Sequence, residues 1–461
     1  MIPIVTPQEM GDIDAAAPEP VEELIDRAGR ATARVALQML GGAYGRVVDV
    51  LAGAGNNGSD GRAAAHLLAS RGVTVRVIDA AVQPSVLPPC DLVIDAAYGT
   101  GFRGEWNAPE IVTRSGERPQ VLAVDIPSGV NASTGEAGPG VLAADRTVTF
   151  QALKPGLVFG AGRALCGEVE VADIGLDVSG ATQHLVEAHD VASWWPSRES
   201  DAHKWNGAVR VVAGSGGMLG AGRLSAAAAA RTGAGLVTLS SPGIDPEARD
   251  EIIQRRIPAA GFHVDVFEDL DRFGALVIGP GLGREEATIT SARALIGEST
   301  LPVVVDGDAI FAAAWSADGA APLLRPRGRP TVITPHDGEF SLLAGHPPGA
   351  DRVAATRELA ADLDATVLLK GPTTVVATPG GEVLVVDHGD ERLATAGSGD
   401  VLAGMIATLL AAGVVPQRAA AGAAWLHADA ARRGPRRGLL AGDIVELIPM
   451  ALGALGTLEE R

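Results

Sequence analysis

The sequence predicts an α/β protein in which a doubly wound unit, built on a parallel sheet, is followed along the chain by a second α/β unit. Short β-branched runs alternate with Ala-rich helical patterns. The runs are almost continuously apolar, as strands covered by helices on both faces must be. The 59 glycines and an aromatic content of 3% suit many tight turns between strands and helices. With 461 residues, 47% of them hydrophobic, the chain is long enough for two or three domains.

The first half contains the strand and helix patterns of one such unit. A helical pattern over 61–72 follows the first strand and represents the helices expected between the strands. Five apolar runs are predicted as strands: 46–53, 73–79, 91–99, 121–129 and 146–153.

A break in the pattern predicts a domain boundary. Residues 189–207 lose the periodicity and carry three of the six tryptophans. We therefore expect a first domain over 1–195, a linker over 196–204 and a second domain over 205–461. The second domain is expected to contain six strands: 207–215, 235–242, 275–283, 302–309, 331–340 and 365–371.

Charge and composition exclude several classes of partner. The formal net charge of -19 argues against a nucleic-acid surface, which needs Lys and Arg, and the basic run 432–437 fits a solvated loop. The longest apolar stretch, 401–415, is too short to cross a bilayer and is predicted as a buried helix. We expect no membrane partner and a homo-oligomer.

The N-terminus and the cysteine count predict the cellular compartment. The first residues, "MIPIVTPQEMGDID", lack the basic and apolar segments of a signal peptide. Only Cys90 and Cys166 occur, so a disulfide scaffold is excluded and a reducing cytoplasm is expected.

The loop "VLAGAGNNGSDG", residues 50–61, is the first candidate site. Its glycines allow close backbone approach, and a helix starting after Gly61 would direct free N–H groups toward an anion. The lysine of a phosphate-binding P-loop is missing. Asn56, Asn57 and Asp60 offer amide and carboxylate groups, which suit a ribose or an amide better than a bare phosphate. A tight turn with an Asx cap is the structural alternative.

Two more motifs end strands of the first half. Asp95 opens "DAAYGTGFRGE", and Asp125 opens "DIPSGVNASTGE", which also contains Ser128. Strand ends of an open α/β sheet meet at one edge, so these groups are expected near Asn57. Their oxygens suit a hard cation, or one carboxylate acts as a general acid or base. A solvated turn is the alternative for any single aspartate.

The second half carries a different set of motifs. A long glycine loop that leads into an Ala-rich helix occurs within 214–239, a second glycine segment occurs at 279–284, and Lys370 ends a strand in "LLKGPTTVV". The sharpest signal is "TAGSGDVLAGMIATLLAAG", residues 395–413, where a glycine turn precedes a helix. The helix N-terminus offers N–H groups to an anion, and Asp400 can orient or deprotonate a hydroxyl that attacks a phosphoryl group. The nine histidines lack zinc-ligand spacing.

The first-half motifs together resemble the signature set of the NAD(P)H-hydrate epimerase domain of the YjeF N-terminal type, across nearly all of 1–195. That family interconverts the R and S hydrates, NAD(P)HX, at C6 of the nicotinamide ring. The resemblance implies that Asp125 touches the substrate as acid or base. It implies that Asn57, Asp95 and Ser128 bind a potassium ion. The implied substrate contacts are Asn56, Asn57, Gly58, Ser59, Asp60, Gly99, Thr100, Gly101, Phe102, Arg103, Gly104, Glu105 and Asp125. Ser59 departs mildly from the glycine usual there.

The second-half motifs, over roughly 205–461, resemble the ribokinase-like superfamily and within it the ADP/ATP-dependent NAD(P)H-hydrate dehydratase. In that family a phosphoryl group from ADP or ATP with Mg²⁺ turns the hydrate's hydroxyl into a leaving group. The implied contacts with the hydrate are Ala221, Gly281, Gly283, His336 and the catalytic Asp400. The implied contacts with the adenine nucleotide are Lys370, Gly371, Pro372, Thr373, Thr374 and Gly399. Two stretches, "HKWNG" and "AGSGD", depart from the usual pattern at one position each.

These resemblances predict a fused repair enzyme, an isomerase and a lyase in one chain. The first domain would supply the S epimer that the second consumes, and the partners would be NAD(P)HX and the adenine nucleotide. Two other functions stay open at this point. The second half alone would permit a small-molecule kinase, and the first half would permit a non-catalytic nucleotide- or RNA-binding module with a Rossmann-like fold. His336 and Glu339 alone would fit structural roles.

Overall fold

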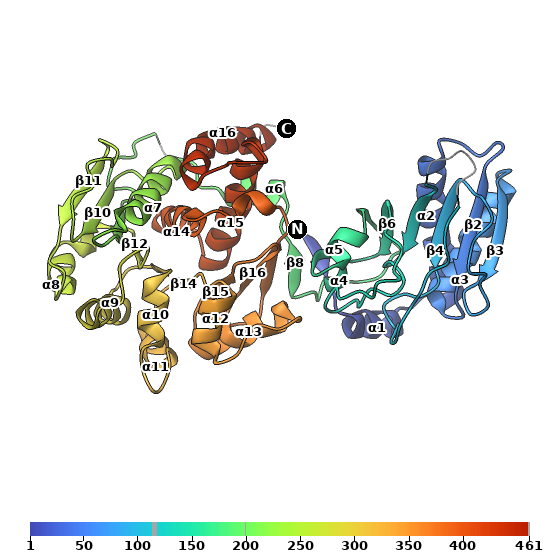
Figure 1. Ribbon diagram of the computed structural model, residues 1–461, viewed down its shortest axis with the longest axis horizontal. Coiled ribbons are helices and arrows are strands. Elements are labelled where there is room, and N and C mark those ends of the chain that lie inside the picture. The colour runs from blue at the N-terminus through green and yellow to red at the C-terminus, as the bar shows by residue number, and fades with distance from the viewer. Residues whose placement is uncertain (113–117, 199, 460–461) are drawn as a thin grey trace. The chain divides into compact units, whose positions relative to one another are not determined.

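The computed structural model describes residues 1–112, 118–198 and 200–459, and its elements are labelled in Figure 1. The chain divides into two compact units, Ile2–Gln183 and His184–Arg461, the latter together with Met1. The predicted linker, 196–204, falls within the second unit. The compact units thus have other bounds than the predicted domains. The assignment of one activity to 1–195 and of the other to 205–461 remains a prediction.

The first unit contains one six-stranded sheet in the order β3-β2-β4-β5-β6-β7. Every neighbouring pair in it is parallel, as the continuously apolar runs predict. All five predicted strands are confirmed. The elements are β1 (Ile2–Ile4), α1 (Pro7–Ala16), α2 (Val21–Leu40), β2 (Val47–Ala52), α3 (Asn56–Ser70), β3 (Thr74–Asp79), β4 (Leu92–Ala96), β5 (Gln120–Val124), β6 (Arg146–Phe150), α4 (Pro155–Val158), α5 (Gly162–Leu165) and β7 (Glu168–Ala172). The strand β8 (Gln183–Leu185) begins at the last residue of this unit and continues into the second.

The strand order places a ligand site in the first unit. From β2 the chain runs outward to β3 and then returns to the other side of β2 as β4. The connections that leave β2 and β4 therefore diverge at the carboxyl ends of these strands. Such a switch point opens a crevice in doubly wound sheets and is where they bind ligands.

The start of α3 differs from the prediction. The helix begins at Asn56, not after Gly61, so Asn56–Asp60 form its first turns instead of a loop. Two glycines make this possible. A Cβ on Gly58 would lie 2.0 Å from the carbonyl oxygen of Gly53, and one on Gly61 would lie 2.5 Å from Cβ of Ala96. The helix therefore packs against the ends of β2 and β4 more closely than any larger residue would permit.

The second unit repeats the architecture on a larger sheet. Its strands run β17-β16-β15-β14-β13-β12-β9-β10-β11, parallel except at β15-β16 and β16-β17. The six predicted strands are confirmed. The strands are β9 (Val209–Val212), β10 (Val237–Ser241), β11 (Ile252–Arg256), β12 (Ala275–Ile278), β13 (Val303–Val305), β14 (Thr331–Ile333), β15 (Thr366–Leu369), β16 (Thr374–Ala377) and β17 (Val383–Val386).

Helices of the second unit surround this sheet (Figure 1). The predicted buried helix is confirmed as α14, whose residues Val401–Leu410 are all buried against α7 and α15. The helices are α6 (Ala188–Trp194), α7 (Leu219–Thr232), α8 (Phe262–Phe267), α9 (Glu286–Glu298), α10 (Asp308–Ala314), α11 (Ala321–Leu324), α12 (Asp337–Ala344), α13 (Arg352–Leu363), α14 (Ser398–Ala411), α15 (Pro416–Arg433) and α16 (Ala441–Glu459), with 3₁₀ turns at Leu270–Arg272, Arg325–Arg327 and Glu391–Leu393.

A second switch point lies between β9 and β12. The chain moves from β9 through β10 to β11 and then returns to β12 on the other side of β9. Two glycine-rich loops of the second half, 213–218 and 279–285, begin just after these two strands, and the first leads into α7. Among the described residues, no helix combines the length and apolarity needed to span a membrane.

Candidate active sites

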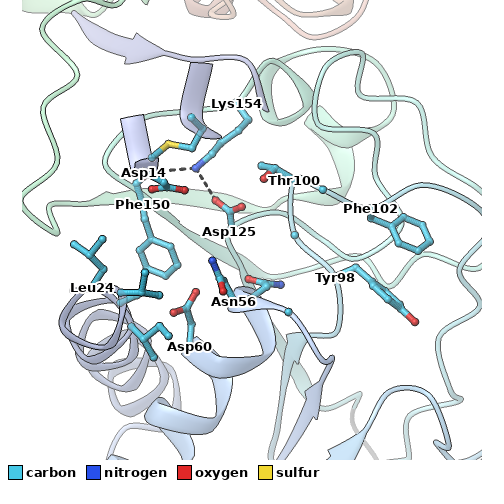
Figure 2. A pocket seen from close by; sticks show the side chains of 18 of the residues that line it. Asp14, Leu24, Asn56, Asp60, Tyr98, Thr100, Phe102, Asp125, Phe150 and Lys154 are labelled. Atoms are coloured by element: carbon cyan, nitrogen blue, oxygen red, sulfur yellow. Dashed lines mark hydrogen bonds and ion pairs between the residues drawn. The ribbon is translucent and has the colours of Figure 1, made fainter. Parts of the chain in front are cut away.

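A cavity of about 850 Å³ opens at the switch point of the first unit (Figure 2). The loop after β2 and the start of α3 form one wall, and the loop after β4 forms another. Apolar side chains of α2, among them Leu24, Ile25 and Ala28, line a third side. A mostly apolar pocket with a few polar groups is the usual form of a small-molecule site.

Asp125 is fixed by a buried lysine. It follows β5 with a φ of 66°, a left-handed conformation that is unusual for a residue with a side chain. The Nζ atom of Lys154, 1% exposed, lies 2.6 Å from Oδ1 of Asp125. Thr149 donates to the same oxygen at 3.1 Å and accepts from Lys154 at 2.9 Å. Lys154 also donates to the Phe150 carbonyl, so its charge cannot turn away to water.

Asp60 lies in a different environment on α3. Its residue is 8% exposed, and its carboxyl group has no hydrogen-bond or ion-pair partner within 1–112, 118–198 or 200–459. Burial, helped by the negative charges of Asp125 and Asp14, raises the pKa of Asp60 to about 8, against a smaller opposing effect of Lys154. Asp60 therefore favours its protonated form at neutral pH, in surroundings unlike those of Asp125.

Asp95 and Ser128 form a buried pair beside this cavity. The Ser128 hydroxyl donates to Oδ1 of Asp95 at 2.6 Å, and its backbone N–H donates to Oδ2 at 2.9 Å. Burial raises the pKa of Asp95, while these hydrogen bonds counteract the rise. Both polar atoms of the Asn57 side chain are buried without a partner among the described residues. A Cβ on Gly99 would lie 3.3 Å from Cβ of Asn57 and 3.4 Å from Oδ2 of Asp125, so this glycine lies between the two side chains.

The cavity includes most, but not all, of the predicted substrate contacts. Those that line it are Asn56, Asn57, Asp60, Gly99, Thr100, Gly101, Phe102, Arg103 and Asp125. Gly58, Ser59, Gly104 and Glu105 are not among its lining residues. Gly58 faces Gly53, and Ser59 turns its hydroxyl to the Gly55 carbonyl at 3.4 Å. These four residues can shape the wall, and a contact between any of them and a substrate stays a prediction.

The second unit gathers charged groups at the carboxyl ends of β13 and β15. Nζ of Lys370 lies 2.8 Å from Oδ1 of Asp306 and 3.8 Å from Oε2 of Glu339. Burial alone would lower the pKa of Lys370, but the carboxylates of Asp306 and Glu339 raise it. A Cβ on Gly399 would lie 3.3 Å from this ammonium group. Lys370 therefore reaches the glycine turn that begins α14, where an anion would also meet the helix N-terminus.

Asp400 lies in the first turn of α14, after Gly397 with a φ of 89°. Burial raises the pKa of Asp400 to about 7, with a further rise from Asp306 and a smaller opposing effect of Lys370. A carboxyl with this pKa exchanges a proton near neutral pH, as a general base must. The sequence predicted Asp400 as the proton acceptor, and the environment of its side chain is compatible with that role.

The other predicted contacts with the hydrate occupy the neighbouring loops. A Cβ on Gly281 would lie 2.8 Å from Cβ of Ala221, which places these two residues side by side. Gly283 donates its N–H to Asp308 at 2.9 Å. His336 begins α12 as its N-cap, with Nδ1 accepting from Gly338 at 3.0 Å, while 61% of its side chain is exposed. It therefore has the structural role that the sequence left open, and its Nε2 lies 3.6 Å from Oε2 of Glu339.

The predicted nucleotide loop begins at Lys370. Arg352 donates to the Lys370 carbonyl at 2.8 Å and binds both carboxylate oxygens of Asp337, at 3.0 and 2.8 Å. A Cβ on Gly371 would lie 2.9 Å from the Arg352 guanidinium. Thr373 is buried, and Thr374 is the first residue of β16. Gly371 and Pro372 thus form the tip of a connection whose ends are held by the sheet.

Three residues of these sites were missed from the sequence: Lys154, Asp306 and Arg352. Lys154 precedes Pro155 and Asp306 follows β13, so both stand just after strands that were predicted correctly. That placement was a usable signal. Arg352 begins α13, and nothing local in the sequence marks it as a neighbour of Lys370.

Each of the two α/β units collects charged groups at the carboxyl ends of its parallel strands, and this arrangement defines a protein with two nucleotide-type enzyme sites. Comparison with known proteins identifies them. Residues 209–449 match the family described as NAD(P)H-hydrate dehydratase, and 21–88 with 78–156 match the YjeF-related protein N-terminus.

Relatives of similar length match nearly the whole chain. The bifunctional NAD(P)H-hydrate repair enzyme Nnr of Moorella thermoacetica is 35% identical, over 97% of this chain and 96% of its own. That of Mycobacterium leprae is 39% identical, over 88% of each chain. The ADP/ATP-dependent NAD(P)H-hydrate dehydratase of Bacillus subtilis, co-crystallised with ATP/Mg²⁺, is 27% identical, with a TM-score of 0.51 over 58% of this chain and 97% of its own.

The chain therefore belongs to the family of bifunctional NAD(P)H-hydrate repair enzymes. The predicted fold class, an N-terminal Rossmann-like unit followed by a ribokinase-like unit, is confirmed. The family membership favours the predicted fused epimerase and dehydratase over a small-molecule kinase joined to a non-catalytic module.

Proposed function

We propose that this chain repairs hydrated nicotinamide nucleotides in two steps at two sites. Residues 1–195 would interconvert the R and S forms of NAD(P)HX, and 205–461 would dehydrate the S form with ADP or ATP. The observation that carries this proposal is the presence of both families in one chain, aligned end to end with relatives that bear the bifunctional name.

At the first site, the hydrated ring would enter the cavity between α3 and the loop after β4. Residues 56–60 and 99–105 would form its walls, and Asp125 would exchange a proton with the substrate. The ion pair with Lys154 supports this role because it stabilises the charged form of Asp125 and fixes its orientation.

Asn57, Asp95 and Ser128 would hold a potassium ion near this cavity. Their amide, carboxylate and hydroxyl oxygens are the donors that a hard cation prefers. The buried Asn57 amide group has no partner among the described residues, and a buried polar group needs one. This supports a bound cation as its partner. A bound cation would supply positive charge at the floor of the site and fix the loop after β4.

At the second site, Asp400 would take the proton of the hydrate's C6 hydroxyl as that oxygen attacks the terminal phosphorus of the nucleotide. A P–O bond of the nucleotide breaks as the new one forms. The C6–O bond then breaks with phosphate as leaving group, and loss of the C5 proton restores the double bond of NAD(P)H. Lys370 and the N-terminus of α14 would stabilise the phosphate charge, which is most of what phosphoryl transfer needs.

Ala221, Gly281, Gly283 and His336 would form the hydrate-binding part of this site. Lys370 to Thr374, with Gly399, would bind the adenine nucleotide. Mg²⁺ would enter with the nucleotide phosphates, because the nearby Asp306 and Asp308 carboxylates already have partners in Lys370 and Arg284. The ion would reduce the charge repulsion between the phosphates.

Other expectations also belong to this proposal. The net charge of -19 supports the absence of nucleic-acid binding, and two buried free cysteines support a reducing compartment, the cytoplasm. A homo-oligomer is expected and would be measured by light scattering.

Absorbance at 340 nm tests the proposed function. Acid-generated NADHX, a mixture of both epimers, is incubated with the full-length protein and ADP, and in parallel with ATP. We expect complete recovery of NADH absorbance with one or both nucleotides. No recovery with either would contradict the proposal. Accumulation of a stable phosphorylated metabolite in place of free phosphate would favour a kinase.

A further inference from the structure

The first-unit cavity contains two carboxyl groups in opposite surroundings. The Asp125 carboxylate meets the buried ammonium group of Lys154 at 2.6 Å and the Thr149 hydroxyl at 3.1 Å. Both partners donate to it, so one oxygen of this carboxyl group is fixed by an ion pair and a hydrogen bond. Figure 2 shows Asp125 above the cavity, joined to Lys154.

Asp60 has none of these partners. Figure 2 shows its carboxyl group directed from α3 toward the cavity. It is 8% exposed and, within the described part of the chain, accepts no hydrogen bond and pairs with no cation. The part of α2 that lines the cavity, at Val21, Leu24, Ile25 and Ala28, is entirely apolar. A largely buried carboxyl group without a protein donor favours its protonated form.

We propose that Asp60 and Asp125 are the two halves of one acid–base pair, in which Asp60 gives a proton to the C6 hydroxyl of the hydrate and Asp125 takes one from the incoming water. This inference rests on the proposed epimerase function of the same cavity. It assigns Asp60 a catalytic role beyond substrate contact and makes Lys154 a positioning residue that acts through Asp125.

The charged groups around Asp60 support this division. Asp14 from α1 and Asp125 from the turn after β5 are negative, and Lys154 before α4 is positive. Arg103, in the loop after β4, also lines the cavity. Burial dominates these effects and raises the pKa of Asp60 to about 8, so that the proton is present at neutral pH. Paired carboxyl groups with opposite protonation are the usual arrangement for acid and base roles in one site.

The step balances in atoms and charge. The C6–O bond breaks with its electron pair on oxygen, and that oxygen takes the Asp60 proton and leaves as water. The lone pair of ring N1 forms a C6=N1 double bond, which gives a planar cation. A water molecule attacks C6 from the opposite face and loses a proton to Asp125. The reverse reaction begins from protonated Asp125 and ionised Asp60, so one pair serves both epimers.

The pH dependence of epimerisation tests the pair. R-NADHX is converted by full-length protein at fixed potassium concentration, and S-NADHX formation is followed by chromatography. Wild-type kcat/KM should fall about tenfold per pH unit above pH 8, as Asp60 loses its proton. Asp60→Asn should lower kcat by roughly 10²- to 10⁴-fold and abolish this falling limb. Asp60→Glu should recover part of the rate together with the limb.

A matched control separates the role of Asp60 from general charge effects. Asp12→Asn removes an exposed carboxyl group of α1 that does not line the cavity, and it should leave rate and pH profile unchanged. Asp60→Asn with more than a tenth of wild-type activity and an unchanged falling limb would overturn the proposal.

Isotope incorporation tests the bond-breaking step. In H₂¹⁸O, each epimerisation should place one ¹⁸O at C6 of the product. Retention of the original oxygen would overturn the proposed step.

Epimerisation by wild-type protein and by Asp60→Asn distinguishes a failure of this inference from a failure of the proposed function. If wild-type protein does not epimerise R-NADHX, the proposed function of the first unit fails. If wild-type protein epimerises and Asp60→Asn does so equally well, only the acid–base pair fails. The dehydration of S-NADHX with ADP by Asp60→Asn should equal that of wild type, because this reaction belongs to the second unit.

Discussion

The buried carboxyl group of Asp60 should destabilise the first unit in a way that depends on pH. Its pKa is about 8 in the folded protein, against an ordinary value of 3.8 that applies to the unfolded chain. Between about pH 4 and 8 the folded state thus keeps a proton that the unfolded state has lost. Because the unfolded state binds fewer protons there, the free energy of unfolding falls as pH rises through this window and is constant above it.

The size of the effect follows from the two pKa values. Each pKa unit corresponds to about 1.4 kcal/mol, so the full difference would cost roughly 6 kcal/mol at pH 9. Water penetration and local movements relieve part of the cost of a buried charge, and we expect about 2–4 kcal/mol. Asp60→Asn carries no ionisable group, so it should be more stable than wild type by an amount that grows from pH 5 to pH 8.

Trp106 allows this measurement in the full-length protein, because it is the only tryptophan in residues 2–183. We would incorporate 5-fluorotryptophan, assign its resonance with Trp106→Phe, and follow urea unfolding at pH 5 to 9. Asp12→Asn is the control and should show the wild-type pH dependence. Parallel stability curves for wild type and Asp60→Asn across this range would refute the reasoning.

Three further predictions concern the two sites. Lys154→Met leaves the Asp125 charge without its partner and should lower the stability of the first unit, measured by the Trp106 assay, by about 3–5 kcal/mol. The control Arg34→Met removes a surface ion pair with Glu170 and should lower the stability by less than about 1 kcal/mol. Dehydration of S-NADHX should speed up as pH rises through about 7, where Asp400 loses its proton, and Asp400→Asn should lose roughly 10²- to 10⁴-fold in rate with no such rise. Replacing potassium by choline should slow epimerisation but not dehydration, and Asn57→Ala should remove that dependence; equal epimerase rates in both salts would exclude the cation site.

The sequence predicted the strands and the motif positions well because both are local. Apolar runs such as 46–53 and 365–371 specify buried parallel strands without knowledge of their neighbours. The edges of the second sheet were harder to predict. In β11, two of the five residues are exposed and two are half-buried, so the strand lacks a continuous apolar pattern. The start of α3 at Asn56 was also missed, because the glycines that suggested a loop serve instead to bring the helix close to β2.

The contacts between side chains within the two sites could not be predicted from the sequence, because they depend on the fold. Asp125 and Lys154 are 29 residues apart, and Lys370 and Asp306 are 64 apart, so no spacing rule joins them. The difference between Asp60 and Asp125 is likewise invisible in the sequence. It arises because apolar residues of α2 cover one carboxyl group while a buried lysine meets the other.

The central claim, two independent sites acting in sequence, is tested most directly by complementation between two inactive variants. Asp125→Asn and Asp400→Asn are each incubated with pure R-NADHX and ADP, alone and mixed, and NADH is followed at 340 nm. Asp125→Asn alone should convert R-NADHX only at the spontaneous rate of epimerisation, and Asp400→Asn alone should stop at a mixture of R and S. The mixture of the two proteins should restore full recovery of NADH. No recovery in the mixture, or rapid recovery with either variant alone, would contradict the account.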